Sequence, residues 1–439
     1  MLELEGKRVL VLGAGISGRS AAAFCAQQGA HVLLADEQSD ARPEGLPSSV
    51  ELSLRQPFPD PADFDLVVPS PGIPPARYRA RARCVWGDIE LAGRALAVPI
   101  AAVTGTNGKS TTVRLLEAML RAAGLRARAA GNVGDAALGL VGEPLDVAVL
   151  EVSSFQLETT ESFRPRVAVL LNLAPDHLDR HGDLAGYLAA KARIFQNQTA
   201  DDVAILNADP ALDDLAQSLT GQVFRFAVRG SVTRGACWDG DAVVLRGVGM
   251  AQRIALEGLP RPSGPLRENL LAALLAAIAL DAEPSKALSA LAGFRALPHR
   301  CELVAERGGV RWVNDSKATN PSATVPALAL ATGPLLWIAG GKDKGLDYFA
   351  LAEAPLRGVR RLLLIGAAAP RIAEALAGRV EIESVGTLEA AVARAAALAR
   401  PGDMVLLSPA CSSFDQFRNF EHRGERFREL VRALCEESP

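Results

Sequence analysis

The chain has 439 residues, of which 49% are hydrophobic and 22% are charged, and its formal net charge is -3. One hydrophobic core rarely supports a chain of this length, so two or three domains of roughly 100 to 200 residues are expected. Asp and Glu (50) slightly outnumber Lys and Arg (47), which argues against a nucleic-acid-binding protein because such proteins carry basic surfaces. We therefore expect small anions as partners.

The cysteines and the apolar runs argue against two further classes. The six cysteines are scattered singly, without the paired spacing of a zinc site or the density of a disulfide scaffold. The longest apolar run, residues 270–280, is far shorter than the roughly 20 residues that span a bilayer. No apolar signal segment precedes the first predicted strand. We expect a cytoplasmic protein without membrane contact, in which this run forms a buried helix.

Short apolar runs alternate with Ala- and Leu-rich helical stretches along most of the chain, which is typical of parallel sheets covered by helices. We place domain boundaries near residues 98 and 297, where a helical pattern gives way to a proline and a new strand follows. Residues 221–265 lack helical periodicity and are rich in Gly and β-branched residues, so they are expected to add antiparallel strands. The predicted domains are 1–98 with strands at 8–12, 31–35 and 66–68, 99–297 with strands at 100–103, 147–150 and 167–171, and 298–439 with strands at 311–313, 335–339, 361–365 and 404–407.

The first predicted strand is followed by a glycine motif, Gly13-Ala14-Gly15-Ile16-Ser17-Gly18, that opens a helical stretch. Asp36 ends the next strand about twenty residues later, as in a dinucleotide-binding fingerprint. The physical content of the motif is an anion site at a helix N-terminus, and the predicted domain is about half the size of a full dinucleotide fold. Three interpretations stay open from these residues: a nicotinamide cofactor, a mononucleotide diphosphate, or glycines that serve only close helix packing.

A second glycine loop follows the strand at 100–103 and precedes a helical stretch at 113–123. Its backbone N–H groups are expected to surround phosphates, with Lys109 reaching the β and γ phosphates and Ser110 or Thr111 holding Mg²⁺. The loop is a shortened variant, because the standard pattern would place glycine where Val103 stands. The alternative is a glycine-rich turn with a solvated lysine. The nucleoside triphosphate, which we take to be ATP, would contact Thr104, Gly105, Thr106, Asn107, Gly108, Lys109, Ser110, Thr111 and Thr112.

Polar residues stand where two further strands of the middle domain end. The strand at 147–150 runs into Glu151, and the strand at 167–171 is followed by His177 among several acids and amides. Ligands bind where the carboxyl ends of parallel strands meet. Glu151 stands where a nucleotide hydrolase places an acid on Mg²⁺, and His177 is a candidate ligand if two metal ions bridge the phosphates. A structural role for a lone histidine is the alternative.

The last predicted domain repeats this arrangement with three polar segments. Residues 314–321, 340–344 and 408–420 each follow an apolar strand and are partly cationic. Such loops are suited to binding carboxylates and to closing on a nucleotide. The alternative interpretation is that they are solvated surface loops.

Together these motifs resemble those of the Mur ligases, the family that builds the peptide of the bacterial cell-wall precursor with one ATP per bond. The resemblance covers essentially the whole chain and is strongest to the members that add D-glutamate to UDP-N-acetylmuramoyl-L-alanine. It implies an α/β fold of three domains: a Rossmann-like N-terminal domain, a central P-loop ATPase-like domain with a mainly parallel sheet, and a Rossmann-like C-terminal domain. The segments that carry it are 104–111, 151–158, 176–179, 190–193, 297–300, 314–320 and 408–424.

The resemblance also implies cofactors and site residues. The enzyme would be a monomer that uses ATP and two Mg²⁺ ions and works through an acyl phosphate intermediate. Its first domain would bind the UDP group of the substrate rather than a nicotinamide cofactor. Glu151 with Ser110 or Thr111 would hold one ion, and His177 with Lys191, modified to a carbamate, would hold the other. Further nucleotide contacts would be Asn269, Arg300, Asp315 and Lys317. Substrate contacts would be Ile16, Ser17, Asp36, Gly72, Asn132, His177, Thr319, Lys344, Ser413, Phe414 and Phe420.

Two other functions stay open from the sequence. A ligase of the same fold that adds a different amino acid would share most of these motifs, and D- and L-glutamate differ only in the placement of identical groups. A nucleotide-binding regulator without catalysis would bind ATP but would show no turnover that depends on an amino acid.

Overall fold

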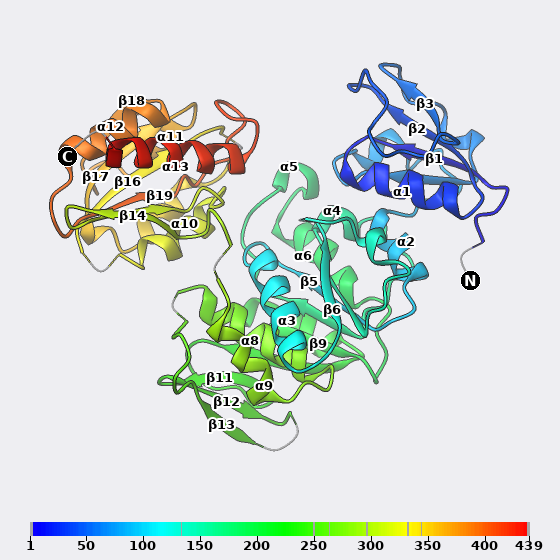
Figure 1. Cartoon of the computed structure of the whole chain (residues 1–439), viewed down its shortest axis with the longest axis horizontal. Helices are drawn as coiled ribbons and strands as arrows, with labels where there is room; N and C mark the ends of the chain where they lie inside the picture. The colour runs from blue at the N-terminus through cyan, green and yellow to red at the C-terminus, as the bar shows by residue number, and fades with distance from the viewer. Residues whose placement is uncertain are drawn as a thin grey trace. The chain divides into compact units, whose positions relative to one another are not determined.

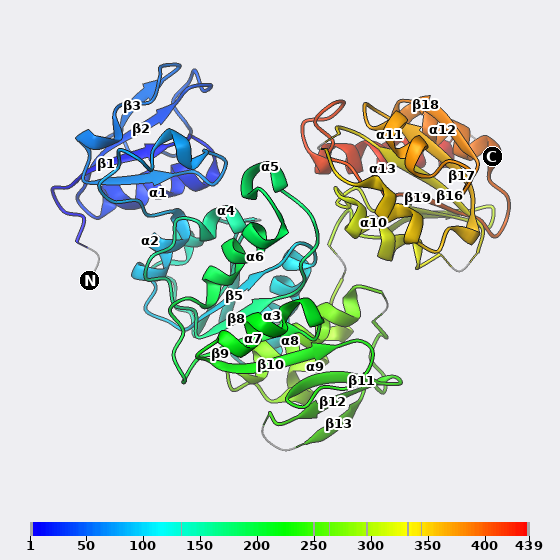
Figure 2. The ribbon, with the colours of Figure 1, turned by 180° about the vertical axis from the view of Figure 1, so that it is seen from behind.

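The computed structural model describes residues 3–132, 134–248, 251–262, 264–295, 297–331, 333–343 and 345–436. Contacts between residues divide the chain into two compact units. The first unit contains residues 1–173, 177–262 and 266–294, and the second contains residues 174–176, 263–265 and 295–439. Within the described ranges the strands form three sheets, which Figure 1 shows in chain-order colours and Figure 2 shows from behind.

The N-terminal part of the first unit is a parallel sheet whose described strands have the order β3-β2-β1-β4. Helix α1 packs against β1, β2 and helix α2 (Figure 1). The turn from β1 into α1 is tight, since a Cβ added to Gly18 would lie 1.9 Å from the carbonyl oxygen of Gly13. The element bounds are β1 (Arg8–Leu12), α1 (Ile16–Gln27), β2 (His31–Asp36), β3 (Glu51–Leu54), β4 (Leu66–Pro69) and α2 (Asp88–Ala95).

The second sheet of this unit has the order β13-β12-β11-β10-β9-β8-β5-β7-β6 over the described residues. Strands β6 to β11 pair in parallel, whereas β12 and β13 are antiparallel. The strand bounds are β5 (Ile100–Thr104), β6 (Ala127–Gly131), β7 (Val147–Glu151), β8 (Val167–Leu170), β9 (Val203–Asn207), β10 (Gln222–Ala227), β11 (Gly235–Asp239), β12 (Ala242–Arg246) and β13 (Gln252–Ala255). The helix bounds are α3 (Lys109–Ala122), α4 (Ser154–Leu157), α5 (Leu178–His181), α6 (Leu184–Ala192), α7 (Asp213–Ser218), α8 (Leu266–Ile278) and α9 (Pro284–Ser289).

Alternate residues of the central strands face two different cores, as the two-residue period of a strand requires. Ala101 and Val103 of β5 face the core that contains α3 and α8, two helices that lie side by side in Figure 1. Ile100 and Ala102 face a core that also includes residues of the N-terminal sheet and helices, such as Phe24. The two sheets of the first unit therefore share one hydrophobic core.

The second unit contains a sheet of order β14-β15-β19-β16-β17-β18, in which only the β14 to β15 pair is antiparallel among the described strands. Buried Trp337 lies on the central strand β16, and its indole N–H donates to the carbonyl oxygen of Ser408 at 2.8 Å. Helices α10 and α11 contribute to the core on one face, and α12 and α13 to the core on the other. The bounds are β14 (Glu302–Arg307), β15 (Val310–Asn314), α10 (Pro321–Leu328), β16 (Leu335–Gly340), β17 (Val359–Ile365), α11 (Ala369–Ala375), β18 (Ile382–Gly386), α12 (Leu388–Leu398), β19 (Met404–Leu407) and α13 (Phe420–Glu436).

The fold class predicted from the sequence is confirmed, and each predicted strand coincides with a strand of the structure. Residues 270–277 are buried in α8, as predicted for the longest apolar run. The segment 221–265 contributes antiparallel pairs, but its strand β10 pairs in parallel with both neighbours. Residues 1–98 share a core with the middle sheet and belong to the same compact unit. The domain boundaries at 98 and 297 stay predictions. None of the helices in the described ranges has both the length and the apolar composition needed to span a bilayer.

Candidate active site

The second glycine loop joins strand β5 to helix α3, as predicted. Strand β5 is buried throughout, and α3 begins directly after Gly108, whose φ of 86° is left-handed. A Cβ at Gly108 would lie 2.5 Å from Oδ1 of Asn269, and one at Gly105 would lie 2.9 Å from Cβ of Leu171. Both turns therefore require glycine, and the loop closes tightly against α8 and the end of β8. This places Asn269, a predicted nucleotide contact, beside the loop.

Lys109 and Asn172 hold the backbone of this loop in place. The Lys109 Nζ donates to the carbonyl oxygens of Gly105 at 2.8 Å and Thr106 at 2.9 Å. The Asn172 side chain accepts from the N–H of Asn107 at 2.9 Å and donates to its carbonyl oxygen at 3.2 Å. The ammonium group thus lies at the N-terminus of α3, where the helix dipole adds positive potential. A phosphate group fits this combination of charges.

Glu151 ends strand β7 next to the same loop. In the sheet register it lies beside Val103 of β5, and its side chain is buried, at 2% exposure. Its Oε1 accepts a hydrogen bond from Nδ2 of Asn132 at 2.9 Å, so a predicted substrate contact holds a predicted metal ligand. Ser110 and Thr111 are buried in the first turn of α3. The structure therefore gathers a carboxylate and two hydroxyl groups around the loop.

This donor set fits Mg²⁺. Magnesium prefers oxygen ligands and is usually held by one or two carboxylates together with oxygens of phosphates and water. Across the described part of the chain no group of three or more His, Cys, Asp or Glu side chains is arranged to hold a metal ion. The carboxylate and hydroxyl oxygens at the loop have the hard-donor chemistry that a magnesium–nucleotide complex requires.

His177 and Lys191 meet at Tyr187. His177 precedes α5 with a left-handed φ of 54°, and its ring centroid lies 4.8 Å from that of Phe155 and 6.3 Å from that of Tyr187. Lys191 is buried in α6, where its Nζ lies 4.3 Å from the Tyr187 ring centroid and donates to the carbonyl oxygen of Gly105 at 2.9 Å. The structure thus brings Lys191 into direct contact with the phosphate loop.

Asp36, at the end of β2, organises the first glycine motif. Its carboxylate accepts from the N–H groups of Ala14 at 2.7 Å, Gln38 at 2.8 Å and Ser39 at 2.7 Å. Partial burial works in the opposite direction, yet these backbone donors hold the pKa of Asp36 below its usual value. The carboxylate is therefore charged and engaged by its own turn.

The other predicted contacts of this region lie at the same edge of the N-terminal sheet. Ile16 is 61% exposed in the first turn of α1, and Ser17 beside it is half-buried. Gly72 follows β4, which neighbours β1. A Cβ at Gly13 would lie 2.8 Å from the hydroxyl oxygen of Ser70, which donates to the Gly13 carbonyl oxygen at 3.3 Å. The glycines thus serve close packing and leave the N-terminus of α1 uncovered by a larger side chain.

In the second unit, a buried acid and a buried cation lie at the carboxyl end of the sheet. Asp315 accepts from the hydroxyl group of Ser408 at 2.8 Å and from the N–H of Cys301 at 3.2 Å, and burial raises its pKa to about 7. Arg423 is fully buried on α13 and donates to Ser316 Oγ at 3.0 Å and to backbone carbonyl oxygens. Desolvation lowers the pKa of Arg423 to about 10, so the guanidinium stays charged at neutral pH.

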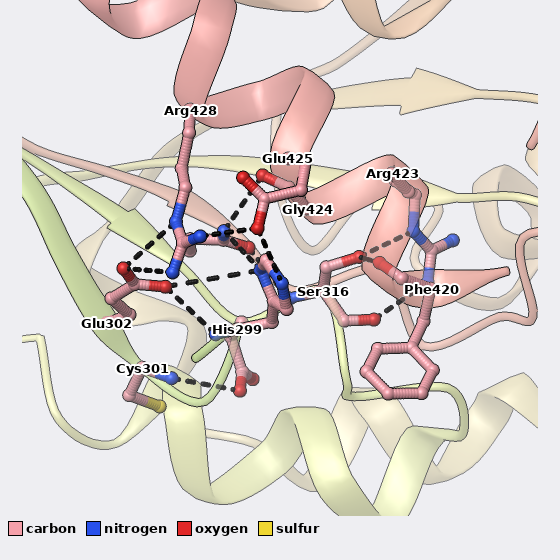
Figure 3. Close-up of polar contacts among 11 residues, drawn as sticks. His299, Cys301, Glu302, Ser316, Phe420, Arg423, Gly424, Glu425 and Arg428 are labelled. Carbon is pink, nitrogen blue, oxygen red and sulfur yellow. Dashed lines mark hydrogen bonds and ion pairs between the residues drawn. The ribbon is translucent and has the colours of Figure 1, made fainter. Parts of the chain in front are cut away.

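Figure 3 shows the polar cluster that joins β14 and β15 to helix α13. His299 is buried, with Nδ1 2.9 Å from Nδ2 of Asn314 and Nε2 3.4 Å from a carboxylate oxygen of Glu425. The backbone N–H of His299 donates to Glu302 at 2.9 Å. Arg428 lies between the two acids, donating to Glu302 at 2.6 Å and to Glu425 at 2.5 Å. We define these five residues as the α13 cluster.

The α13 cluster sets the position of predicted site residues on both sides of it. Arg300 follows His299 directly, and a Cβ at Gly424 would lie 2.2 Å from Nδ1 of His299. Helix α13 also carries Phe420, and the Nζ of Lys317 lies 3.6 Å from the centroid of its ring. A predicted nucleotide contact, Lys317, therefore touches a predicted amino-acid contact, Phe420.

The remaining predicted residues of the second unit follow strand ends as expected. Thr319 is half-buried, Ser413 is buried at 2% exposure, and Phe414 is 64% exposed. Lys344 lies outside the described residues. Within each unit the predicted residues gather at the carboxyl end of a sheet, and the set as a whole is divided between the two units.

Several polar residues of these sites were not predicted. The structure adds Asp88 on α2 with Gln156 on α4 in the first unit, and Arg423 with the α13 cluster in the second. It also gives a role at the phosphate loop to Asn172, which the sequence placed only among the polar residues after a strand. Asn172 follows a strand directly, which is a usable signal. The bond between Asp88 and Gln156 spans 68 residues of the chain, and the bond between Arg423 and Ser316 spans 107. Spacing along the chain could not reveal such partners.

Comparisons with known proteins agree with this geometry. A model described as the Mur ligase middle domain matches residues 103–243, and one described as the Mur ligase glutamate ligase domain matches residues 299–411. A protein of Geobacter metallireducens is 42% identical over 447 residues, which cover 99% of both chains. One of Acidobacterium capsulatum is 42% identical over 459 residues, covering 98% of this chain and 97% of its own. Both are named UDP-N-acetylmuramoylalanine--D-glutamate ligase.

Solved structures share the fold at lower identity. A pseudomurein peptide ligase type C from Methanothermus fervidus superposes with a TM-score of 0.64 at 18% identity, covering 98% of this chain and 100% of its own. A MurF ligase from Thermotoga maritima in complex with ADP gives a TM-score of 0.63 at 18% identity, covering 99% and 96%. Identities this low carry information on the fold alone.

Proposed function

The chain belongs to the Mur ligase family, and we propose that it joins D-glutamate to UDP-N-acetylmuramoyl-L-alanine with ATP as the energy source. The observation that carries the proposal is the phosphate loop, in which Lys109 lies at the N-terminus of α3 and the strand β5 that leads into the loop lies beside buried Glu151 in the sheet. Relatives that share 42% identity over nearly the whole chain and bear the name of this ligase support the choice of substrates.

The reaction we propose has two steps. The carboxylate of the alanyl group takes the γ-phosphoryl group of ATP, which gives an acyl phosphate and ADP. The amine of D-glutamate then attacks the acyl carbon, and inorganic phosphate leaves as the amide forms. Because a carboxylate and a triphosphate repel each other, the main task of Lys109 and the α3 N-terminus is to place positive potential where the two anions meet.

We propose two Mg²⁺ ions and a carbamate on Lys191 as further parts of this site. Bound magnesium would neutralise charge on the phosphates. Glu151 with Ser110 or Thr111 would hold one ion, and His177 with modified Lys191 the other. Burial of Lys191 at 1% exposure supports the modification, because a buried ammonium group is disfavoured. An NMR signal from ¹³C-bicarbonate that is lost in Lys191→Arg tests it, and equal spectra for both proteins would contradict it.

Substrate groups are assigned to the two units by their chemistry. Ile16, Ser17, Asp36 and Gly72 would hold the UDP group at the N-terminus of α1, which is an anion site. Thr319, Lys344, Ser413, Phe414 and Phe420 would contact the incoming amino acid, with Arg300, Asp315 and Lys317 contacting the nucleotide. We infer a cytoplasmic monomer without nucleic-acid or membrane partners. The net charge of -3 and the free cysteines among the described residues support this inference. Sedimentation measurements test the oligomeric state.

A panel of amino acids assayed for ADP formation with UDP-N-acetylmuramoyl-L-alanine tests the proposed function. We expect ADP to form with D-glutamate and to stay at background with L-glutamate, glycine and diamino acids. Turnover with a different amino acid would identify another ligase of this family. ATP binding without turnover for any amino acid would indicate a regulator and contradict the proposal.

A further inference from the structure

Two short helices of the first unit, α4 and α5, are tied together by the side chain of Arg180. Its Nε and Nη2 both donate to the carboxylate of Glu158, and the shortest of these bonds is 2.7 Å. Nη2 also donates to the carbonyl oxygen of Ile73 at 3.3 Å. The guanidinium carbon lies 4.8 Å from the centroid of the Phe155 ring. Contacts with two other segments of the chain thus fix this guanidinium group.

The ring of Phe155 connects this guanidinium group to His177. The centroids of the two rings lie 4.8 Å apart and their planes meet at 60°, which is an edge-to-face contact. On another side, the centroid of Phe155 lies 5.6 Å from that of His181, whose Nε2 is 3.0 Å from the hydroxyl oxygen of Ser154. The phenyl ring therefore packs among one guanidinium group and two imidazole rings, and a displacement of the first moves it against His177.

The backbone of His177 depends on support from outside its own helix. Its φ of 54° lies in the left-handed region, which residues other than glycine adopt rarely. The helix that follows, α5, has four residues, and so short a helix has little stability of its own. Such a conformation persists where surrounding contacts fix it. The pair of Arg180 with Glu158 supplies such a contact, and its two side chains are only 13% and 16% exposed.

The geometry of this contact requires an arginine. A guanidinium group is flat, so it can donate to a carboxylate and lie on an aromatic ring at the same time. Arg180 does both, because it bonds to Glu158 while it lies over Phe155. A lysine has a compact charge on a flexible stem, which can reach the carboxylate but cannot also cover the ring. Arg180→Lys therefore keeps the charge and releases the ring.

We propose that Arg180 is a positioning residue for the ligation reaction, because it holds the imidazole ring of His177 in place through Phe155. The inference rests on the proposed function, from which it takes the role of His177 in binding the substrate and the second Mg²⁺ ion. Since Arg180 acts through Phe155, changes at these two positions should not have independent effects on turnover.

The same end of α4 offers a matched control. Nη2 of Arg79 donates to the backbone carbonyl oxygen of Glu158 at 2.6 Å. Arg79→Gln therefore removes an arginine that bonds to the same residue, while the carboxylate of Glu158 and the ring of Phe155 keep their contacts with Arg180. A loss of stability at this end of α4 would appear in both arginine variants, whereas a loss of positioning would appear only in Arg180→Lys.

The first measurement is the steady-state rate of ADP formation in Arg180→Lys, Phe155→Leu, the double variant and Arg79→Gln. We expect each of the first two to lower kcat roughly 10- to 100-fold, as a misplaced catalytic group does. The KM for ATP should change less than about threefold, since the phosphate loop is intact. The double variant should be no more than about threefold slower than the slower single variant. Arg79→Gln should keep the kcat of the unmodified protein.

The second measurement needs neither turnover nor bound metal. The imidazole C–H signals of the histidines are recorded by NMR, and the signal of His177 is identified by its loss in His177→Asn. The ring of Phe155 shifts this signal because the two rings are in contact. We expect Phe155→Leu and Arg180→Lys each to displace the His177 signal. Arg79→Gln should leave the signal in place.

The inference is overturned by an unchanged kcat or an unmoved His177 signal in Arg180→Lys, by multiplied losses in the double variant, or by an equal loss of kcat in Arg79→Gln. Thermal melting shows whether Arg180→Lys folds. If it does not, Glu158→Gln weakens the same tie from the other side and should displace the His177 signal instead. If the unmodified protein forms no ADP with any amino acid, the proposed function fails. The NMR signal then still decides whether Arg180 positions His177, so the two failures are distinct.

Discussion

The phosphate loop of the first unit and the α13 cluster of the second hold charged groups in place by different means. Lys109 of the loop bonds to carbonyl oxygens three and four residues before it, and glycines set the turns. Arg428 of the cluster bonds to Glu302, 126 residues away. The lysine and the glycine turns of the phosphate loop thus lie in one continuous segment, to which Asn172 and Lys191 add bonds from elsewhere in the first unit. The second arrangement exists only when sheet and helix have both folded. Changes in the loop should therefore affect chemistry, and changes in the cluster should affect stability.

Lys109→Ala should have the largest effect and should leave the fold intact. Removing a single charge that stabilises a phosphoryl-transfer transition state costs roughly two to three orders of magnitude in turnover. The variant loses the two bonds of Lys109 to the loop, but Asn172 and the glycine turns still hold the loop backbone, so the melting temperature should change little. ADP release and thermal melting are the measurements, and Lys286→Ala on the exposed side of α9 is the control. Retention of more than about a tenth of the original turnover would contradict the role of Lys109.

Gly424→Ala should have the opposite profile, with a loss of stability confined to the second unit. The new methyl group would meet Nδ1 of His299 at 2.2 Å, and overpacking of this kind costs about 1–3 kcal/mol. Hydrogen exchange should speed up in peptides of α13 and β14 and stay unchanged in α3. Gly358→Ala, whose Cβ would meet its nearest neighbour at an ordinary 3.4 Å, is the control. Equal hydrogen-exchange rates in both variants would show that the close approach of residue 424 to His299 does not affect stability.

The smallest effect concerns the pH dependence of Asp315. Its folded pKa is raised to about 7 from the ordinary 3.8, so its contribution to stability is complete below about pH 4 and is lost as the pH rises through 7. Asp315→Asn has no ionisable group at this position and does not lose stability in this way. The free energy of unfolding of the variant, relative to that of the unmodified protein, should therefore increase between about pH 5 and pH 8. Urea unfolding at both pH values measures the difference. Asp146→Asn should show no such trend, because the pKa of Asp146 is about 2.

The same contrast explains how much could be predicted from the sequence. The long apolar strands and the phosphate loop could be predicted because their signals are contained in a few consecutive residues. Strands β3, β6, β9, β14 and β18 were missed within the described chain. Strand β6, with three alanines in five residues, has a composition that a helix would also accept, and β18 mixes polar and apolar residues without a clear period.

The site residues divide in the same way. Glu151 and His177 stand at strand ends and could be proposed from position alone. Lys191 sits in an Ala-rich helical pattern that gives no sign of its burial beside the phosphate loop, and its assignment came only from the family resemblance. Asp88, His299 and Arg423 have partners that are set by packing between distant segments, which a single sequence does not encode in any local pattern.

The anchoring of Arg423 has a consequence for the order of events during synthesis on the ribosome. Its guanidinium group bonds to Ser316 and to the carbonyl oxygens of Gly340, Cys411 and Ser412. These residues belong to three separate segments, one of which is the end of strand β16. Those segments cannot complete these bonds until residue 423 has emerged from the exit tunnel. The phosphate loop needs nothing from that far along the chain. We therefore expect the phosphate loop of the nascent protein to fold before the proposed amino-acid site around Arg423 does.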